Sequence, residues 1–143
     1  MKISTRGRYA VRVMLDLAEQ DSEAYIPLAD IAGRQEISEK YLESIVSVLS
    51  KNQLVRSLRG KGGGYRLAKK PSEYTIGSIL RAAEGSLAPA ACLEEGTPPC
   101  SRLPFCKTRK MWEGLYRCIN EYFDGITLQD LLEDNETFFR RQR

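Results

Sequence analysis

Three of the four cysteines of this chain, Cys92, Cys100 and Cys106, lie in one stretch that proline and glycine residues interrupt, and the chain contains no histidine. In a reducing compartment, such a group of cysteines is more typical of metal binding or redox chemistry than of structural disulfides. If the three side chains gather at one point, they form a three-thiolate site that still needs a fourth ligand. What such a site would control depends on the elements around it.

The size and charge of the chain limit the kinds of protein it can be. Its 143 residues fit one compact domain, or a small domain with an extension. No apolar run approaches the roughly 20 residues that span a bilayer, and the amino terminus lacks a signal-peptide core. We therefore expect a cytoplasmic protein with no membrane partner. Residues 1–70 carry a net charge of +5 and residues 71–143 carry −2, so the first half is the natural face for nucleic acid, although a solvated surface can carry such a difference.

The first segment has the pattern of an amphipathic helix behind a capping hydroxyl from Ser4 or Thr5. Its apolar residues recur three and four positions apart, at Tyr9, Ala10, Val13, Met14, Leu17 and Ala18. Arg6, Arg8 and Arg12 occupy the early turns, where cations oppose the helix dipole unless they face an anion. These arginines indicate either phosphate contacts or a solvated face.

Two further helices are expected after a short gap. The first begins near Pro27, which suits a first helical turn, and ends near Gly33. Ser38 is expected to cap the second, whose apolar stripe is Leu42, Ile45, Val46 and Leu49. Its opposite face carries Glu39, Lys40, Glu43, Ser44 and Ser47. This arrangement matches a helix-turn-helix with a recognition helix, although any small α domain can contain two packed helices.

A β-hairpin is expected next, because the strand-like runs Leu54–Arg59 and Tyr65–Leu67 flank a tip that contains Gly60 and Lys61. The glycines of the tip permit positive φ angles and close approach of the backbone. Such a wing can enter a minor groove or lie along phosphates, and a narrow minor groove attracts arginine best. A nucleotide-binding loop does not fit, because Lys61 is followed by glycine and a strand rather than by Ser or Thr and a helix.

The second half begins with a helix that Thr75 caps and Gly85 ends. Prolines then exclude a long regular element from residues 87–106, and a loop of that length is usually functional or disordered.

A long helix is expected from Lys107 to Asp124, followed by a short helix that Thr127 and Asp130 cap together. The apolar stripe of the long helix is Met111, Trp112, Leu115, Ile119, Tyr122 and Phe123. Its breadth suits packing against a partner subunit, and packing against the core of the same chain is the alternative. The tail from about residue 136 is expected to be loose, although Phe138 and Phe139 could dock.

Taken together, these segments resemble the Rrf-two (Rrf2) type winged-helix regulators of bacteria, and within that family the iron-sulfur cluster regulators. The resemblance covers nearly the whole chain. It rests on STRGRYAV at residues 4–11, Met14-Leu15-Asp16, Ile37-Ser38, Tyr41-Leu42-Glu43, Leu54-Val55 and RGKGGGY at residues 59–65. It implies a homodimer on a pseudo-palindromic site in double-stranded DNA, with the third helix in the major groove and the wing in an adjacent minor groove.

The resemblance also implies which residues read DNA. Those at matching positions are Ser38, Lys40, Tyr41, Glu43 and Ser44 on the third helix and Arg59 on the wing. Glu43 can accept a hydrogen bond from a cytosine amino group, which would be a base-edge contact. Lys40 is larger and Ser44 smaller than the side chains expected from the iron-sulfur regulators, so an operator sequence is not implied. The expected DNA-binding set is completed by Arg6, Arg8, Gly60 and Lys61.

For the cysteines, the resemblance implies a 2Fe-2S cluster bound by Cys92, Cys100 and Cys106. Structural zinc is a second interpretation, although zinc sites favour cysteine pairs two to four residues apart and this chain has none. A thiol or disulfide switch without metal is a third, because nearby arginine and lysine side chains can lower a thiol pKa. Cysteines without a special role are the fourth.

The fourth ligand is where the chain departs from the family pattern. That pattern places a histidine three residues after the last cysteine, where this chain has Arg109, which has no lone pair to donate. Some relatives use a carboxylate from the partner's first helix as the fourth ligand, but the matching residue in this chain is Arg8, which argues against that arrangement. Cys118 lies about 18 Å beyond Cys106 along a helix, and we expect it to be a small buried residue. An exchangeable small ligand remains open, as do the oxygen or nitrogen atoms of Glu94, Glu95, Ser101, Lys107, Thr108 and Glu113.

These expectations define a mainly α fold with a small β-hairpin wing. They divide the chain into a winged helix-turn-helix DNA-binding region (1–84), a cysteine sensor loop (85–106), a long C-terminal dimerisation helix with a short terminal helix (107–135) and a flexible tail (136–143). The expected function is a homodimeric transcription regulator that senses iron-sulfur cluster or redox status. The alternative is a sulfur-metabolism repressor, similar to cysteine regulators, controlled by a protein partner or by thiol oxidation. An enzyme is not expected, since no histidine and no paired carboxylates are available.

Overall fold

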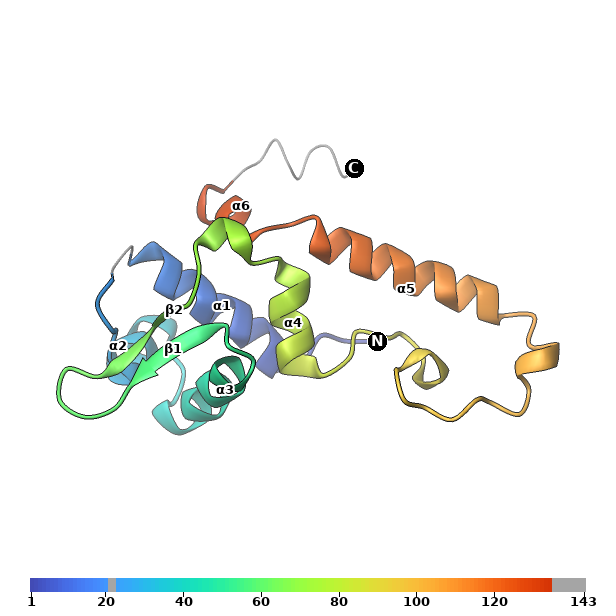
Figure 1. Ribbon diagram of the computed structural model, residues 1–143, viewed down its shortest axis with the longest axis horizontal. Coiled ribbons are helices and arrows are strands. Elements are labelled where there is room, and N and C mark those ends of the chain that lie inside the picture. Colours follow the sequence, from blue (N-terminus) through green and yellow to red (C-terminus); the bar gives the residue numbers. More distant parts are fainter. Residues whose placement is uncertain (21–22, 135–143) are drawn as a thin grey trace.

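The computed structural model describes residues 1–20 and 23–134, and over these residues the chain forms six α-helices and one two-stranded hairpin (Figure 1). The helices are α1 (Thr5–Glu19), α2 (Leu28–Gln35), α3 (Glu39–Lys51), α4 (Ile76–Glu84), α5 (Arg109–Asp124) and α6 (Leu128–Leu132). Strands β1 (Val55–Leu58) and β2 (Gly64–Leu67) lie between α3 and α4 in the sequence. The expectation of a mainly α fold with a hairpin wing is therefore confirmed.

Side-chain caps explain where most of the helices begin. Ser4, Ser38, Thr75 and Thr127 each accept a hydrogen bond from the amide three residues further on, which satisfies a free N–H at the start of α1, α3, α4 and α6. These are the expected capping positions. Helix α2 differs, because Pro27 is its N-cap residue and not part of its first turn.

The hydrophobic core forms around α1, which contacts α2, α3, α4, α6 and β2. The stripe expected for α3 is buried there, with Leu42, Ile45, Val46 and Leu49 each at most 1% exposed. Because these four side chains fix the inner face of α3, its opposite face is turned toward solvent.

The hairpin is fastened to the segment that leads into α2. Strands β1 and β2 pair antiparallel, and Tyr65 of β2 also exchanges two backbone hydrogen bonds of 2.8 Å with Ile26. This close approach requires glycine at position 64, where φ is +154° and a Cβ would lie 2.1 Å from the Ile26 carbonyl oxygen. The position of the wing relative to the helix-turn-helix is thereby fixed.

Helix α5 and the stretch before it extend away from the other helices (Figure 1). The carboxyl-terminal half of α5 is held to α4, since Arg81 of α4 donates to Asn120 at 3.0 Å and forms an ion pair with Asp124. No helix in the described part of the chain is long and apolar enough to cross a membrane. The expected loose tail, with Phe138 and Phe139, lies outside the described residues.

Candidate nucleic-acid interface and cysteine loop

The residues expected to read DNA from α3 differ in how free their side chains are. Lys40 and Glu43 are exposed, and neither side chain has a hydrogen bond or ion pair within residues 1–20 and 23–134. Ser38, also exposed, caps the helix through its hydroxyl. The Ser44 hydroxyl donates to the backbone carbonyl of the half-buried Tyr41 at 2.7 Å. Among the α3 residues expected to read DNA, Lys40 and Glu43 are therefore the exposed ones whose side chains can reach a ligand without giving up a hydrogen bond.

Arg12 does not extend toward an anion, contrary to one interpretation of the α1 pattern. Its guanidinium donates to the side-chain oxygen of Gln35 at 3.1 Å and to the Gln35 carbonyl at 2.5 Å, and it lies 4.9 Å from the centre of the Tyr9 ring. Arg12 thus joins α1 to the end of α2, a role that the helix pattern alone does not reveal. Arg6 and Arg8 are exposed at the start of α1. Arg8 donates to the Thr5 hydroxyl at 3.2 Å, and neither arginine forms an ion pair with a described residue, so both can face an anion.

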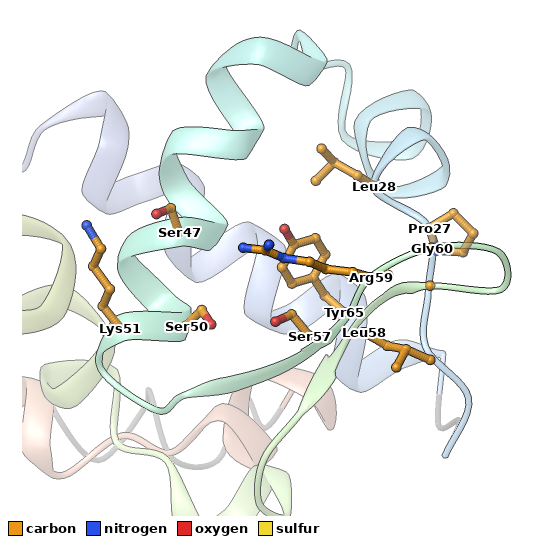
Figure 2. A pocket seen from close by; sticks show the side chains of 12 residues that line it. Pro27, Leu28, Ser47, Ser50, Lys51, Ser57, Leu58, Arg59, Gly60 and Tyr65 are labelled. Carbon is orange, nitrogen blue, oxygen red and sulfur yellow. The ribbon is translucent and has the colours of Figure 1, made fainter.

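A groove of about 510 Å³ separates α3 from the wing. Figure 2 shows the Arg59 side chain extending from the wing toward α3, and Ser47 of α3 lines the same groove. Ser50 and Lys51 line the α3 side of the groove, and Ser57 lines the wing side. A guanidinium, an ammonium group and three hydroxyls all donate hydrogen bonds, so the groove suits the oxygens of phosphates or base edges.

The wing tip borders the same groove. Gly60 lines it with a φ of +91°, and Lys61 is exposed beside it. The sequence pattern identified neither Ser50 nor Lys51. Their signal is the spacing from Ser47, because positions three and four residues further along a helix lie on the same face.

The three cysteines of the expected sensor site are exposed free thiols between α4 and α5. Short 3-10 turns at Ala91–Leu93 and Leu103–Phe105 interrupt this stretch. Among the described residues, no three Cys, Asp or Glu side chains lie close enough together to hold a metal ion. The donor chemistry nevertheless fits a thiolate-bound metal, since three thiols on one loop supply the ligands that iron-sulfur clusters and zinc use.

Cys106 lies just before the amino terminus of α5, in surroundings that favour the thiolate. Its Sγ is 3.4 Å from the Thr108 hydroxyl oxygen. Hydrogen bonds from the Thr108 side chain and then from the Thr108 and Arg109 amides lower the pKa of the Cys106 thiol, because they stabilise its charged form. Arg109 in turn donates to Glu113 at 2.6 Å. Glu113, one candidate for the fourth ligand, is therefore already paired with a cation.

Large apolar side chains are exposed along α5: Met111 is 57% exposed, Trp112 38%, Leu115 42% and Tyr122 43%. Ile119 of the same stripe is instead buried. Cys118 is exposed, so the expectation that it is a small buried residue is wrong. Neighbouring positions on a helix point about 100° apart, and the side of α5 that packs inward includes Ile119 and leaves out Cys118.

Comparison with known proteins identifies what this arrangement is similar to. The chain matches the family model described as "Rrf2: Iron-dependent Transcriptional regulator" over residues 3–134. It is 44% identical over 136 residues to the HTH-type transcriptional regulator IscR of Aliivibrio salmonicida. The matched residues make up 95% of this chain and 80% of that relative.

Two solved structures share the fold. T. potens IscR is 40% identical with a TM-score of 0.73, over 94% of this chain and 88% of that one. CymR, described as the global cysteine regulator of B. subtilis, is 37% identical with a TM-score of 0.76, over 94% of this chain and 98% of that one. These proteins are transcriptional regulators and not enzymes, which confirms the expected class.

Proposed function

Because the chain belongs to the Rrf2 family of transcriptional regulators, we propose that it is a homodimeric DNA-binding regulator whose cysteine loop senses iron-sulfur cluster or redox status. The observation that carries the DNA-binding part is the groove between α3 and the wing, which Arg59 enters from the wing side. Lys40 and Glu43 project from the exposed face of the same helix. A recognition helix and a basic wing beside one groove can contact a major groove and the adjacent minor groove together.

Within this proposal, the exposed residues divide into base-reading and phosphate-binding groups. Glu43 would accept from a cytosine amino group, and Lys40 would donate to guanine in the major groove. Arg59 would enter the minor groove beside Gly60 and Lys61. The remaining expected residues would position the helix by contacts to phosphates: these are Arg6, Arg8, Ser38, Tyr41 and Ser44.

Dimerisation would use the exposed apolar face of α5. Met111, Trp112 and Leu115 project from the half of the helix that lies beyond its contact with α4. Apolar side chains of this size, gathered on one helix, are typical of an interface. A dimer would place two recognition helices on one pseudo-palindromic DNA site.

The cysteine loop would bind a 2Fe-2S cluster through Cys92, Cys100 and Cys106. The exposure of all three thiols and the lowered pKa of Cys106 support this assignment. When bound, the cluster would supply a group whose presence follows the iron-sulfur supply and whose oxidation state follows the redox conditions. The loop would have to close to bring the three thiolates together.

A contact at the end of α4 could carry such a movement to the DNA-binding region. Glu84, the last residue of α4, accepts a hydrogen bond from the Ser4 amide at 2.9 Å and another from the Ser4 hydroxyl. A pull on the loop that follows Gly85 would therefore act on the start of α1, where Arg6 and Arg8 lie.

A second candidate function follows from the likeness to CymR, which covers nearly all of that protein's chain. In that version the chain is a repressor of sulfur metabolism, and a protein effector or oxidation of exposed thiols replaces the cluster. Zinc bound by the same thiolates is the remaining metal alternative.

In this proposal each segment of the chain has its own role. Residues 1–84 would bind DNA, 85–106 would sense and 107–135 would dimerise, in the cytoplasm where the chromosome of a bacterium is accessible.

Anaerobic purification with absorption spectra and quantitation of iron, acid-labile sulfide and zinc tests the sensor. The cluster version expects equal iron and sulfide, their loss in Cys100→Ser and their retention in Cys118→Ser. Stoichiometric zinc without iron or sulfide would overturn it. If replacement of all three loop cysteines by serine leaves DNA binding and its regulation unchanged, the result favours control by a protein effector over control by a cluster.

A further inference from the structure

A second groove, of about 610 Å³, lies on the side of the wing that faces away from α3. The strand register explains why the wing has two different faces. Arg56 and Arg66 are cross-strand partners and line this outer wing groove. The next pair along the strands, Ser57 and Tyr65, lines the groove toward α3. Successive residues of a strand point to opposite faces, so one hairpin separates the two grooves.

The outer wing groove has an excess of positive charge. Arg56, Arg66, Lys69 and Lys70 line it, and none of the four forms an ion pair with another described residue. Two like charges directly opposite each other on a hairpin are destabilising. An anion bound between Arg56 and Arg66 would remove that repulsion.

One of these cations is held in place before any ligand binds. The Arg66 guanidinium donates to the Glu23 carbonyl oxygen at 2.6 Å and stacks on the Tyr25 ring at 4.6 Å. Two acidic residues, Glu23 and Glu73, also line the groove, so four cations face two carboxylates there. The Glu73 carboxylate accepts from the Lys70 amide at 2.9 Å. Arg66 is thus oriented by a carbonyl and a ring, and its charge is not neutralised.

Part of the groove wall is apolar. The half-buried Leu67, Ala68 and Pro71 line it, whereas Leu17 and Ala18 of α1, which also border it, are buried. A DNA backbone offers phosphates and sugars but few apolar groups, whereas a polypeptide can offer carboxylates beside apolar side chains. The groove also lies near the base of the hairpin, while Arg59 and Gly60 near the tip line the opposite groove.

The carboxyl-terminal tail of the chain is a poor occupant. Residues 136–143 contain Arg140, Arg141 and Arg143 but one acidic residue, Glu136, so the tail has the same charge as the groove. From these observations we propose that the outer wing groove binds an acidic polypeptide segment of a second protein, with carboxylates on Arg56, Lys69 and Lys70 and an apolar side chain against Leu67. This proposal depends on the proposed function in one respect only, which is that DNA lies on the α3 side of the wing.

Peptide selection against the full chain tests this inference. A random peptide library displayed on phage is selected on the wild-type protein and counter-selected on an Arg56→Glu/Lys69→Glu double variant. The expected result is enrichment of sequences that combine acidic and apolar residues. A synthetic copy of an enriched peptide should bind the double variant at least ten times more weakly than wild type and bind Arg59→Glu as well as wild type, with melting curves confirming that all variants are folded.

Operator DNA distinguishes this proposal from the proposed function. We expect Arg59→Glu to weaken operator binding much more than Arg56→Glu/Lys69→Glu does. If selection yields no acidic peptides, or if enriched peptides bind the double variant unchanged, the proposal is overturned. If the double variant loses operator affinity as strongly as Arg59→Glu, the groove is a phosphate site for DNA and not a protein site. Loss of operator binding by the wild type would count against the proposed function alone.

Discussion

Arg34 of α2 donates two hydrogen bonds to the Asp16 carboxylate of α1, from Nε to Oδ2 at 3.0 Å and from Nη2 to Oδ1 at 2.8 Å. Asp16 is 2% exposed, and the side-chain amide of Gln35 donates a third hydrogen bond to its carboxylate at 2.8 Å. A buried carboxylate must be paired in this way because burial of an unpaired charge is costly. The contact fixes α2 on α1, and with it α3, since three residues separate α2 from α3.

Replacing Arg34 by alanine should lower the free energy of unfolding by about 2 kcal/mol, because the buried carboxylate keeps one donor. The loss of stability is smaller than for a fully buried pair, since the Arg34 side chain is 39% exposed and water can replace part of its hydrogen bonding to Asp16. Urea denaturation followed by circular dichroism measures the change. The control is Arg109→Ala, which removes an i,i+4 pair on the surface of α5 and should cost less than about 0.5 kcal/mol. Equal losses in the two variants would contradict the role of Asp16.

Tyr74→Phe should destabilise the protein by about 1 to 3 kcal/mol at neutral pH. The Tyr74 hydroxyl accepts from the Ala68 and Lys69 amides, both at 2.9 Å, and donates to the Leu54 carbonyl at 2.6 Å, so it joins the two ends of the hairpin. Phenylalanine leaves the Lys69 amide without its acceptor.

The same variant carries a pH signature. Burial raises the pKa of Tyr74 above its ordinary value of about 10. The folded state then holds the proton more tightly than the unfolded state, so this contribution is complete below about pH 10 and is lost as pH rises through the folded pKa. Urea titrations of both proteins should show their stability difference shrinking above pH 10. A difference that stays constant would mean that Tyr74 ionises equally easily in both states.

Gly64→Ala should cost about 1 to 3 kcal/mol and weaken DNA binding as well. A Cβ at this positive φ would collide with the Ile26 backbone and push the wing away from α2. Gly33→Ala is the matched control, because its Cβ would meet nothing within 4 Å in helix α2 and should stabilise by about 0.5 to 1 kcal/mol. Thermal melts and operator titrations report both effects. A Gly64 variant with normal stability and affinity would show that the wing needs no such anchor.

The sequence predicts those features of the fold that depend on neighbours a few residues apart. The caps at Ser38 and Thr75 and the buried stripe of α3 are examples, because the groups that interact lie within one turn of each other. Arg12 is a counterexample, since its partner Gln35 is 23 positions away and no helical pattern connects them. The sequence pattern does not predict the exposure of Cys118 either, because that exposure depends on which side of α5 meets α4. For the candidate site, the family motifs point to Arg59 and Glu43, whereas the groove between α3 and the wing required the folded chain.

Glu43→Ala should relax base preference more than it lowers affinity, since a base-edge contact contributes mainly to discrimination. We expect the preference for a cytosine-containing site over a single-substitution site to fall by about 1 kcal/mol. Fluorescence anisotropy with paired duplexes at fixed salt measures it, with Glu39→Ala as the control on the same helix. Arg59→Ala should instead weaken binding to the operator. An equal loss on operator and random duplex after Glu43→Ala would rule out its role in base readout.

The double variant Trp112→Glu/Leu115→Glu should convert the proposed dimer into a folded monomer. Both side chains are exposed on the free half of α5, so the fold of the single chain does not need them. In a dimer they would be buried, where two new carboxylates carry a large desolvation cost. Sedimentation velocity should show the dissociation constant rising at least tenfold, which corresponds to about 1.4 kcal/mol. Operator affinity should fall with it, because a monomer reaches one half-site. Arg117→Glu controls for added charge on the same helix, and a double variant that remains dimeric would place the subunit interface elsewhere.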